Sequence, residues 1–325
     1  MKLETQYDAI IIGAGISGLM CAKKLHDSGL NILVIDKGRN FGGRMSTRHF
    51  NNAIFDHGAQ FFTSKTKIFN DYCNKWYKSG IIDIWYDYDL LKKSSNKYPR
   101  WFCKNGMNTL PKYIASKINV LRSTCITKIK KNNNLWTVYS NELNKFQAKK
   151  LIITIPMPQI LKLIDESDYI FNRDMIKNFK SIKYEKGLAI LAVLDDHSRI
   201  PYPGIIQPNN NDIAWIADNH IKGLSSIPAL TIHTSADYAF RMFEKDSEEQ
   251  ALTILNNIHQ YIKSNYKEYQ VHKWGYTTPI KYLKSDDYQF NEQEIFFAGD
   301  SFSGPRIESS ALSGLNTANK ILNRQ

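Results

Sequence analysis

A glycine-rich segment near the start of the chain, Gly13-Ala14-Gly15-Ile16-Ser17-Gly18, has the residue types and spacing needed to bind a phosphate-bearing cofactor. In a strand–loop–helix unit the first glycine allows a tight turn, the second lets the backbone approach a pyrophosphate, and the third lets the helix pack close to the strand. The pyrophosphate then lies at the helix N-terminus, where free N–H groups and the helix dipole favour negative charge. The motif predicts a dinucleotide site formed mainly by backbone atoms.

The elements on either side of this motif fit the same unit. An isoleucine-rich run at residues 7–12 predicts a buried strand, residues 19–27 an amphipathic helix, and residues 31–35 a second strand. Asp36 stands at the end of that second strand, where its carboxylate is placed to accept hydrogen bonds from the adenosine ribose and to repel a 2′-phosphate. The unit alone does not distinguish NAD from FAD.

A second glycine pair follows shortly after Asp36. It is Gly42-Gly43, followed directly by Arg44 and Met45. Flexible backbone next to a guanidinium suits a second contact to a pyrophosphate, because arginine offers planar, charge-assisted donors.

Near the other end of the chain, residues 294–298 predict another buried strand, which is closed by Gly299-Asp300. A helix is predicted after Arg306. A carboxylate at the end of such a strand suits the ribityl or pyrophosphate part of FAD, and the N-terminus of the last helix suits the N1/O2 edge of the flavin.

Four segments together resemble the flavin-containing amine oxidase superfamily and, within it, the renalase-like bacterial NAD/FAD-dependent oxidoreductases. They are GAGISGL, FGGRM, the DHGAQFFT segment that begins at Asp56, and AGDSFSGPRIESSALSG. The resemblance extends over essentially the whole chain. It implies an α/β (α+β) fold in which a Rossmann-like FAD-binding domain with a β-meander is joined to a discontinuous, mixed-sheet substrate domain.

The same resemblance implies where the domains lie. The predicted FAD-binding domain comprises residues 1–70, 105–164 and 284–325, and the substrate domain residues 71–104 and 165–283. Local patterns predict strands at residues 120–130, 135–139 and 150–155 in the first domain, strands at 187–194, 213–216 and 229–233 in the second, and a helix at 248–265.

The cofactor contacts are also carried over from the family motifs. Gln60 and Phe61 are expected along the flavin, and Ile126 is expected to meet the adenine through its backbone. The predicted FAD-binding set is Gly13, Gly15, Ile16, Ser17, Gly18, Asp36, Lys37, Gly43, Arg44, Met45, Gln60, Phe61, Ile126, Asp300, Arg306 and Ile307.

A flavin carries the redox chemistry itself, so the protein needs to bind, orient and shield rather than supply a nucleophile. The sequence agrees, since it has no GxSxG elbow, no HExxH and no convincing Cys/His pair. Candidates near the flavin or the substrate are Gln60, His233, Trp274 and Tyr276. Each has a purely structural alternative: a strand-edge glutamine, a satisfied core histidine, or core aromatic residues on a strand.

The resemblance further implies the reaction. A small dihydronicotinamide-like substrate, such as a dihydro-NAD(P) isomer, would give hydride to the flavin, and dioxygen would reoxidise the flavin and yield hydrogen peroxide. Amine oxidation is the enzymatic alternative, and a flavin-bound binding module without turnover is an alternative of another class. Two departures from the family pattern, Pro305 and Gly275, bear on the choice of substrate.

The composition narrows the class of protein. The 43 Lys and Arg against 31 Asp and Glu give a formal charge of +12, but the lysines are dispersed and no nucleic-acid-binding motif is found, so nucleic acid is not expected. A solvated, lysine-rich surface explains the charge about as well as a ligand does, although a basic surface would favour an anionic, phosphate-bearing substrate. No segment approaches the roughly 18 apolar residues of a membrane span, and the first apolar run is too short for a secretory signal, so a cytoplasmic protein is expected. The four cysteines lie far apart, and no metal site is predicted.

Overall fold

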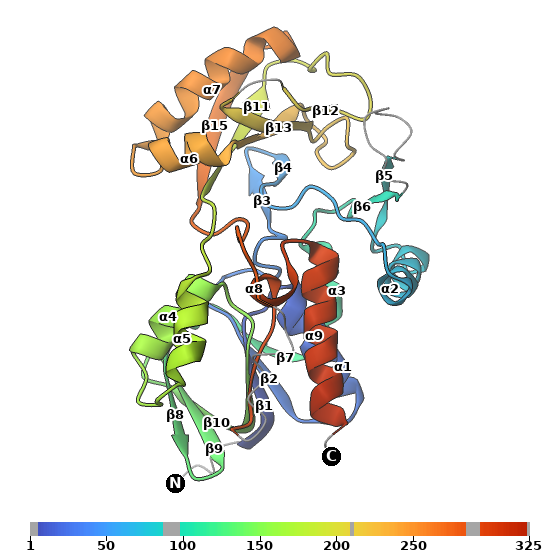
Figure 1. The fold of residues 1–325 in the computed structure, drawn as a ribbon. Helices are drawn as coiled ribbons and strands as arrows, with labels where there is room; N and C mark the ends of the chain where they lie inside the picture. The colour runs from blue at the N-terminus through green and yellow to red at the C-terminus, as the bar shows by residue number, and fades with distance from the viewer. Residues whose placement is uncertain (1–5, 87–97, 209–210, 284–292, 324–325) are drawn as a thin grey trace. The chain divides into compact units, whose positions relative to one another are not determined.

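The computed structural model describes residues 6–86, 98–208, 211–283 and 293–323. The chain forms two compact units, each built from separate segments (Figure 1). The first unit contains Met1–Gly43, Pro111–Lys183 and Pro279–Gln325, and the second contains Arg44–Leu110 and Tyr184–Thr278.

A seven-stranded sheet lies at the centre of the first unit. Its strands are β1 (Gln6–Ile12), β2 (Ile32–Ile35), β7 (Asn119–Leu121), β8 (Ile126–Asn132), β9 (Leu135–Ser140), β10 (Lys145–Ile153) and β16 (Ile295–Phe297). The order is β7-β2-β1-β10-β9-β8, and β16 also pairs with β10. Strands β7, β2, β1, β10 and β16 run parallel, whereas β8, β9 and β10 form an antiparallel meander. The Rossmann-like fold with a β-meander is thus confirmed.

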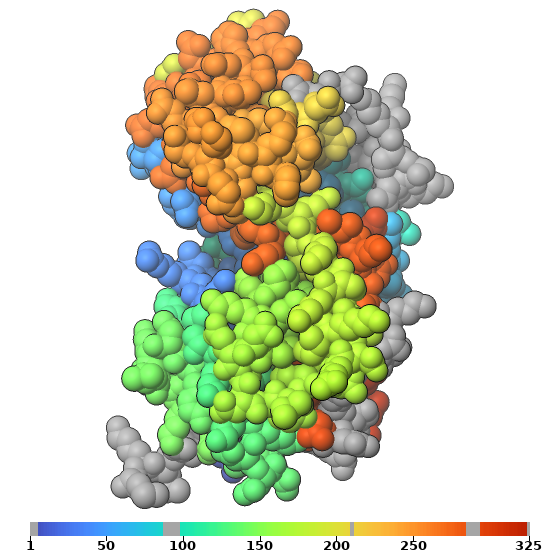
Figure 2. Space-filling view, turned by 60° about the vertical axis from the view of Figure 1, so that its left-hand side comes forward, coloured from blue at the N-terminus to red at the C-terminus, as the bar shows by residue number. Residues whose placement is uncertain are grey.

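The helices of the first unit are α1 (Ile16–Asp27), α4 (Met157–Asp165), α5 (Arg173–Lys180), α8 (Asp300–Ser303) and α9 (Ile307–Leu322), while α3 (Thr109–Ala115) crosses the boundary between the units. Helices α4 and α5, yellow-green in Figure 2, form much of the visible surface of this unit. Helix α9 packs along α1, and the two come so close that a Cβ atom at Gly314 would lie 2.0 Å from Ser17 O. The first and last segments of the chain therefore pack together through α1 and α9, and β16 belongs to the same sheet as β1.

One predicted strand was wrong. Residues 120–130 form two strands, β7 and β8, rather than one. The chain turns at Ser123, whose φ is +55°, and the amides of Ser123 and Thr124 donate to Gly38 O and Asp36 O. These bonds end β7 beside β2 and redirect the chain, so β8 begins the meander instead of continuing the parallel sheet.

The second unit is built on a five-stranded sheet. Its strands are β11 (Gly187–Leu194), β12 (Ile205–Ile206), β13 (Ile213–Asp218), β14 (Ala229–Thr234) and β15 (Tyr266–Trp274), in the order β12-β13-β14-β11-β15. A mixed sheet was expected here, but every recorded pairing within this sheet is antiparallel, and it is the sheet of the first unit that is mixed. Strands β13 and β14, for example, are joined by residues 219–228 alone, a connection shorter than the crossover that a parallel pair needs.

Both faces of this sheet are covered. Helices α6 (Ala236–Met242) and α7 (Ser247–Ile262) cover one face, where Ile254 and Ile258 join a buried cluster with Ile190; their side chains form the orange surface in Figure 2. On the other face Phe55 packs against Leu191. The remaining elements are the hairpins β3 (Thr47–Phe50) with β4 (Ala53–Asp56) and β5 (Asp83–Tyr86) with β6 (Arg100–Phe102), and helix α2 (Lys67–Lys78).

The units and the predicted domains divide the chain differently: residues 44–70, with Phe55 packed on the five-stranded sheet, and 105–110 lie in the second unit, and residues 165–183 lie in the first. The predicted ranges also include residues 1–5, 87–97, 209–210, 284–292 and 324–325, which lie outside the described residues. No helix in the described part of the chain is long and apolar enough to cross a membrane.

Candidate active site

The glycine loop of the first unit joins β1 to α1. Gly13 has a φ of +112°, a conformation that side-chain-bearing residues rarely adopt, and its amide donates to Ile35 O at 2.8 Å. A Cβ atom at Gly18 would lie 2.0 Å from Gly13 O. The two glycines therefore allow the turn and the close start of α1, which are the roles predicted from their spacing.

The space in front of α1 fits a phosphate group. The N-cap of the helix is Gly15, which offers no side-chain acceptor to the first-turn amides. A Cβ atom built on Gly15 meets nothing within 4 Å, and Ser17 Oγ is buried without a hydrogen-bond partner among the described residues. An uncapped helix N-terminus beside an unpartnered hydroxyl suits an anion such as a pyrophosphate.

Asp36 ties the glycine loop to the next segment. One carboxylate oxygen accepts from Ala14 N at 2.6 Å and the other from Gly38 N at 2.6 Å. Burial raises the pKa of Asp36, and these two N–H donors oppose the rise. Gly42 N donates to Ala14 O at 3.0 Å, so the second glycine pair lies against the first loop. The exposed Lys37 follows Asp36 directly.

The last part of the chain reaches the same edge of the sheet. Thr154, after β10, donates from Oγ1 to Gly13 O at 3.2 Å, and its carbonyl oxygen is 3.6 Å from where a Gly299 Cβ would lie. Buried Asp300 begins α8, and Arg306 is the N-cap of α9, which has no side-chain cap.

Two further members of the predicted set also lie in the first unit. Ile307 is the first residue of α9, and Ile126 begins β8. The described structure thus gathers the two glycine loops and the Gly299-Asp300 segment within one unit.

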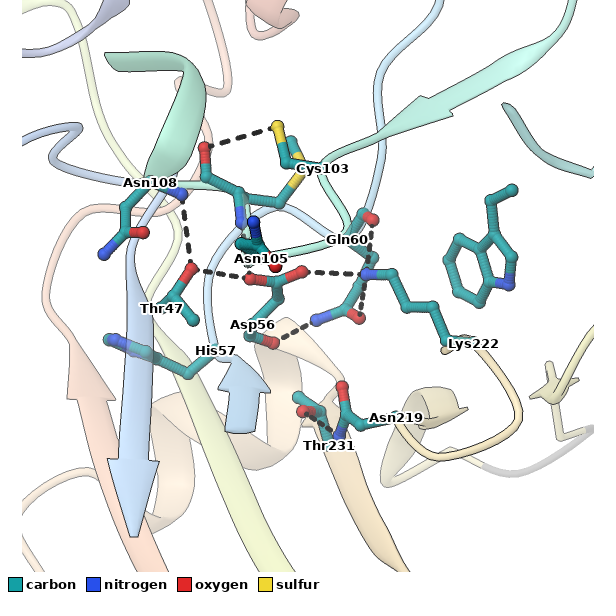
Figure 3. A network of polar contacts seen from close by, with 12 residues as sticks. Thr47, Asp56, His57, Gln60, Cys103, Asn105, Asn108, Asn219, Lys222 and Thr231 are labelled. Carbon is teal, nitrogen blue, oxygen red and sulfur yellow. Dashed lines mark hydrogen bonds and ion pairs between the residues drawn. The ribbon is translucent and has the colours of Figure 1, made fainter. Parts of the chain in front are cut away.

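A buried polar network links three segments of the second unit (Figure 3). Lys222 Nζ lies 2.9 Å from Asp56 Oδ2, and neither side chain is exposed to solvent. Asp56 Oδ1 accepts hydrogen bonds from Thr47 Oγ1 at 2.7 Å and from Met107 N at 2.8 Å. Both carboxylate oxygens are engaged, which is the condition under which a buried charge is tolerated.

This network fixes the orientation of Gln60, as Figure 3 shows. Lys222 Nζ donates to Gln60 O at 2.8 Å and lies 3.5 Å from Gln60 Oε1, while Gln60 Nε2 donates to Asp56 O. Gln60 is only 6% exposed. The ammonium group of Lys222 also lies 4.5 Å from the centroid of the Trp85 ring.

Neither Asp56 nor Lys222 was given a role from the sequence. The two residues are 166 positions apart, and nothing local indicates that they pair. The available clue was the position of Lys222 shortly after a strand that ends at Asp218.

Three histidines and Trp274 form a second cluster in this unit. Trp274 Nε1 donates to His57 O at 2.9 Å, and His233 Nε2 lies 3.2 Å from the same oxygen. The His57 ring is stacked on that of Trp274, with centroids 5.2 Å apart, and lies 4.4 Å from the ring of His272. His57 Nδ1 is buried and has no partner among the described residues. The predicted residues His233 and Trp274 are therefore brought together by the backbone of His57.

The histidines of this cluster are held neutral. Burial lowers the pKa of His57 to about 3, and the nearby His272 and Arg48 add to the effect. Burial also lowers the pKa of His233 to about 4, against the opposing bond to the His57 carbonyl, and that of His272 to about 4. At neutral pH the cluster carries no positive charge of its own.

The other predicted residues of the second unit are Arg44, Met45, Phe61 and Tyr276. Arg44 Nη1 donates to Thr277 O at 2.9 Å, next to Tyr276 in the chain. Met45 is buried, and Phe61 belongs to an aromatic group that also contains Trp85. The predicted FAD set has members in both units.

The Rossmann-like sheet, the uncapped glycine loop and the carboxylate at the end of β2 are typical of a dinucleotide-binding protein. Family comparison makes this specific. The NAD(P)-binding Rossmann-like domain family matches residues 11–76, and the flavin-containing amine oxidoreductase family matches residues 88–322. The chain belongs to the flavin-containing amine oxidoreductase family, and its cofactor is FAD.

Individual relatives agree with this assignment. Renalase from Mus musculus is 23% identical over 97% of this chain and 98% of its own length, so the similarity to renalase extends over nearly the whole of both chains. Amine oxidase [flavin-containing] B from Bos taurus is 44% identical over 14% of this chain and 9% of its own length.

Two solved structures share the fold at low identity. A putative protoporphyrinogen oxidase from Exiguobacterium sp. 255-15 has a TM-score of 0.75 at 12% identity, covering 99% of both chains. Putrescine oxidase bound to putrescine has a TM-score of 0.71 at 15% identity, covering 98% of this chain and 100% of the other.

Proposed function

We propose that this enzyme oxidises a small dihydronicotinamide-type substrate, such as a dihydro-NAD(P) isomer, with dioxygen as the final electron acceptor and hydrogen peroxide as the product. Bound FAD supplies the two-electron redox chemistry. The protein's own task is to hold the cofactor, orient the substrate and exclude water.

The observation that carries this proposal is the charge of the groups around Gln60. Asp56 is paired with Lys222, so the network offers no unpaired carboxylate among the described residues. The three neighbouring histidines are neutral, and the buried guanidinium of Arg100, 5.4 Å from the centroid of the Phe61 ring, adds a positive charge. A protonated amine is poorly matched to such surroundings, whereas a neutral ring that carries an anionic group is well matched.

We assign the same roles to the predicted residues. The glycine loop, Asp36 and the N-terminus of α9 hold FAD, as supported by the open space at Gly15 and the absence of a side-chain cap on α9. Gln60, held by Lys222, lies along the flavin. His233, Trp274 and Tyr276 line the substrate side, supported by the shared contact of the first two with His57 O.

The same proposal assigns a separate function to each domain. The Rossmann-like part binds FAD, and the part built on the antiparallel sheet selects the substrate. In the proposed domains, residues 1–70, 105–164 and 284–325 serve the first role, and residues 71–104 and 165–283 the second.

An anaerobic titration of the flavin tests this function. The purified enzyme is mixed with dihydronicotinamide isomers in one series and with primary amines in another, and the flavin absorbance is followed. We expect bleaching by a dihydronicotinamide at stoichiometric amounts, then recovery of the oxidised spectrum and one equivalent of hydrogen peroxide on admission of air. Bleaching by amines alone reverses the assignment to amine oxidation, and bleaching by neither supports a binding module without turnover.

A further inference from the structure

Arg100 is a buried charge in the second unit. It is the first residue of β6, where it pairs across the hairpin with Tyr86 of β5, and it is only 8% exposed. A guanidinium stays protonated at any physiological pH, so burial cannot be relieved by losing the proton. Burying an unpaired charge is costly, and such a group is normally matched by an anion.

No anion of the described chain meets Arg100. Its Nη1 donates to Tyr98 O at 2.7 Å, and the guanidinium also forms a hydrogen bond with the Tyr86 side chain. Its Nε has no hydrogen-bond partner, and no carboxylate among the described residues forms an ion pair with it. The contrast with Lys222 is direct, since that equally buried cation is paired with Asp56.

Aromatic rings surround the guanidinium. Arg100 Cζ lies 5.4 Å from the centroid of the Phe61 ring and 5.9 Å from that of Tyr86. The Phe61 ring also contacts Trp215, with centroids 5.8 Å apart, and Trp215 Nε1 is a second buried donor without a partner in the described part of the chain. Two unused N–H donors therefore lie next to one aromatic ring, although buried indole and guanidinium groups normally find partners.

We propose that Arg100 and Trp215 form a subsite for an anionic group of the substrate, a phosphate or a carboxylate, next to Phe61. The guanidinium fork matches either group through two parallel hydrogen bonds, and the indole N–H adds a third. The FAD pyrophosphate is the other possible source of an anion, but the uncapped N-terminus of α1 already suits it. The subsite deepens the proposed function and rests on it for the position of the reacting ring beside Phe61.

Binding of two oxidised probes to the holoenzyme tests the subsite without turnover. Nicotinamide mononucleotide and nicotinamide riboside differ only in the phosphate, and the perturbation of the flavin spectrum gives their Kd values. For the wild type we expect the mononucleotide to bind at least about tenfold more tightly than the riboside, the range of one charge-assisted contact. In Arg100→Met, which keeps the aliphatic volume, this preference disappears while FAD content stays full.

Two further variants keep the test decisive. Trp215→Phe removes only the N–H and should reduce the preference by a smaller factor, which also covers the case in which Arg100→Met does not fold. Arg173→Met, at an exposed arginine that begins α5, should leave the preference unchanged.

The outcomes separate the subsite from the proposed function. Equal affinity of the wild type for both probes, or no affinity for either, overturns the subsite, as does loss of FAD from Arg100→Met, which would assign Arg100 to the cofactor. A phosphate preference that depends on Arg100 supports the subsite even if reduced nicotinamides fail to bleach the flavin, in which case only the proposed oxidation fails.

Discussion

Asp56 and Lys222 are two opposite charges with no exposure to solvent. Removing both ions from water costs several kcal/mol, which their attraction offsets only when the remaining hydrogen-bonding positions are filled. Here Thr47 Oγ1 and Met107 N donate hydrogen bonds to the second carboxylate oxygen of Asp56, and Lys222 Nζ donates one to Gln60 O. The pair therefore serves to position Gln60, and each charge depends on the other.

Replacing either Asp56 or Lys222 alone should lower the stability of the fold more than replacing both together. We expect Lys222→Met and Asp56→Asn each to lower the free energy of unfolding by about 3–5 kcal/mol, because each leaves an uncompensated buried group. The double variant should be more stable than Lys222→Met. Urea unfolding of the four proteins measures this, and the exposed pair Lys67–Asp71 is the control, for which about 0–1 kcal/mol is expected. Strictly additive single effects would show that the two charges are not coupled.

Among individual residues, the sequence predicted the roles of those whose conformation depends on their near neighbours in the chain. The glycines at 13 and 18 have the backbone roles expected of them. Arg100 and Lys222 escaped prediction because their burial comes from aromatic residues distant in the chain: Phe61 for the former, and Trp85 for the latter. A lysine or arginine in a sequence is normally solvent-exposed, so only the tertiary structure reveals the exceptions.

At the scale of elements, the start of α1 is a backbone surface rather than a set of side chains. The helix has Gly15 as its N-cap and no acidic residue in its first turn. Its dipole is thus left for an anion from outside the chain. A Cβ atom at position 15 has room in the free protein, since nothing lies within 4 Å of it.

Gly15→Val should accordingly separate folding from cofactor binding. We expect the variant to lose most of its FAD, because the side chain occupies the space of the pyrophosphate, while its circular dichroism matches that of the wild-type apoprotein. Flavin absorbance relative to protein absorbance measures the loss, and Gly15→Ala should lose less. Purification of Gly15→Val with full flavin content would refute the assignment of this loop.

The helices and strands were predicted best where burial of apolar side chains alone determines the pattern. The apolar run at residues 187–194 is β11 with the same bounds, because a strand buried on both faces leaves a continuous pattern. The run at 120–130 was misread as one strand because the break at Ser123 depends on bonds to Gly38 and Asp36, which are remote in sequence.

At the scale of the whole molecule, the histidine cluster couples stability to pH. His57, His233 and His272 have pKa values of about 3, 4 and 4 in the folded chain, below the ordinary value of 6.5. The unfolded chain therefore binds protons between pH 6.5 and 4 that the folded chain does not bind. The contribution of these three neutral histidines to the free energy of unfolding is fully present above pH 6.5 and is lost as the pH falls toward 4.

The melting temperature should fall steadily as the pH is lowered from 7 to 5. The free energy of unfolding should fall with pH as well, and His57 alone contributes a slope that approaches about 1.4 kcal/mol per pH unit. Thermal unfolding followed by circular dichroism at several pH values measures it, and His272→Asn should flatten the dependence. His259→Asn, at an exposed residue of α7, is the control and should leave the slope as in the wild type. An unchanged slope in His272→Asn would remove this residue from the linkage.

The interleaving of the two units has a consequence for how the protein is made. Both segments of the second unit, residues 44–110 and 184–278, are translated before β16 and α9. Strand β10 must wait for β16, and α1 must wait for α9. At about 5–20 residues per second, the nascent chain holds β1 and the glycine loop without their final neighbours for many seconds. Cofactor capture is thereby expected to be among the last events of biosynthesis, after both segments of the second unit have been translated.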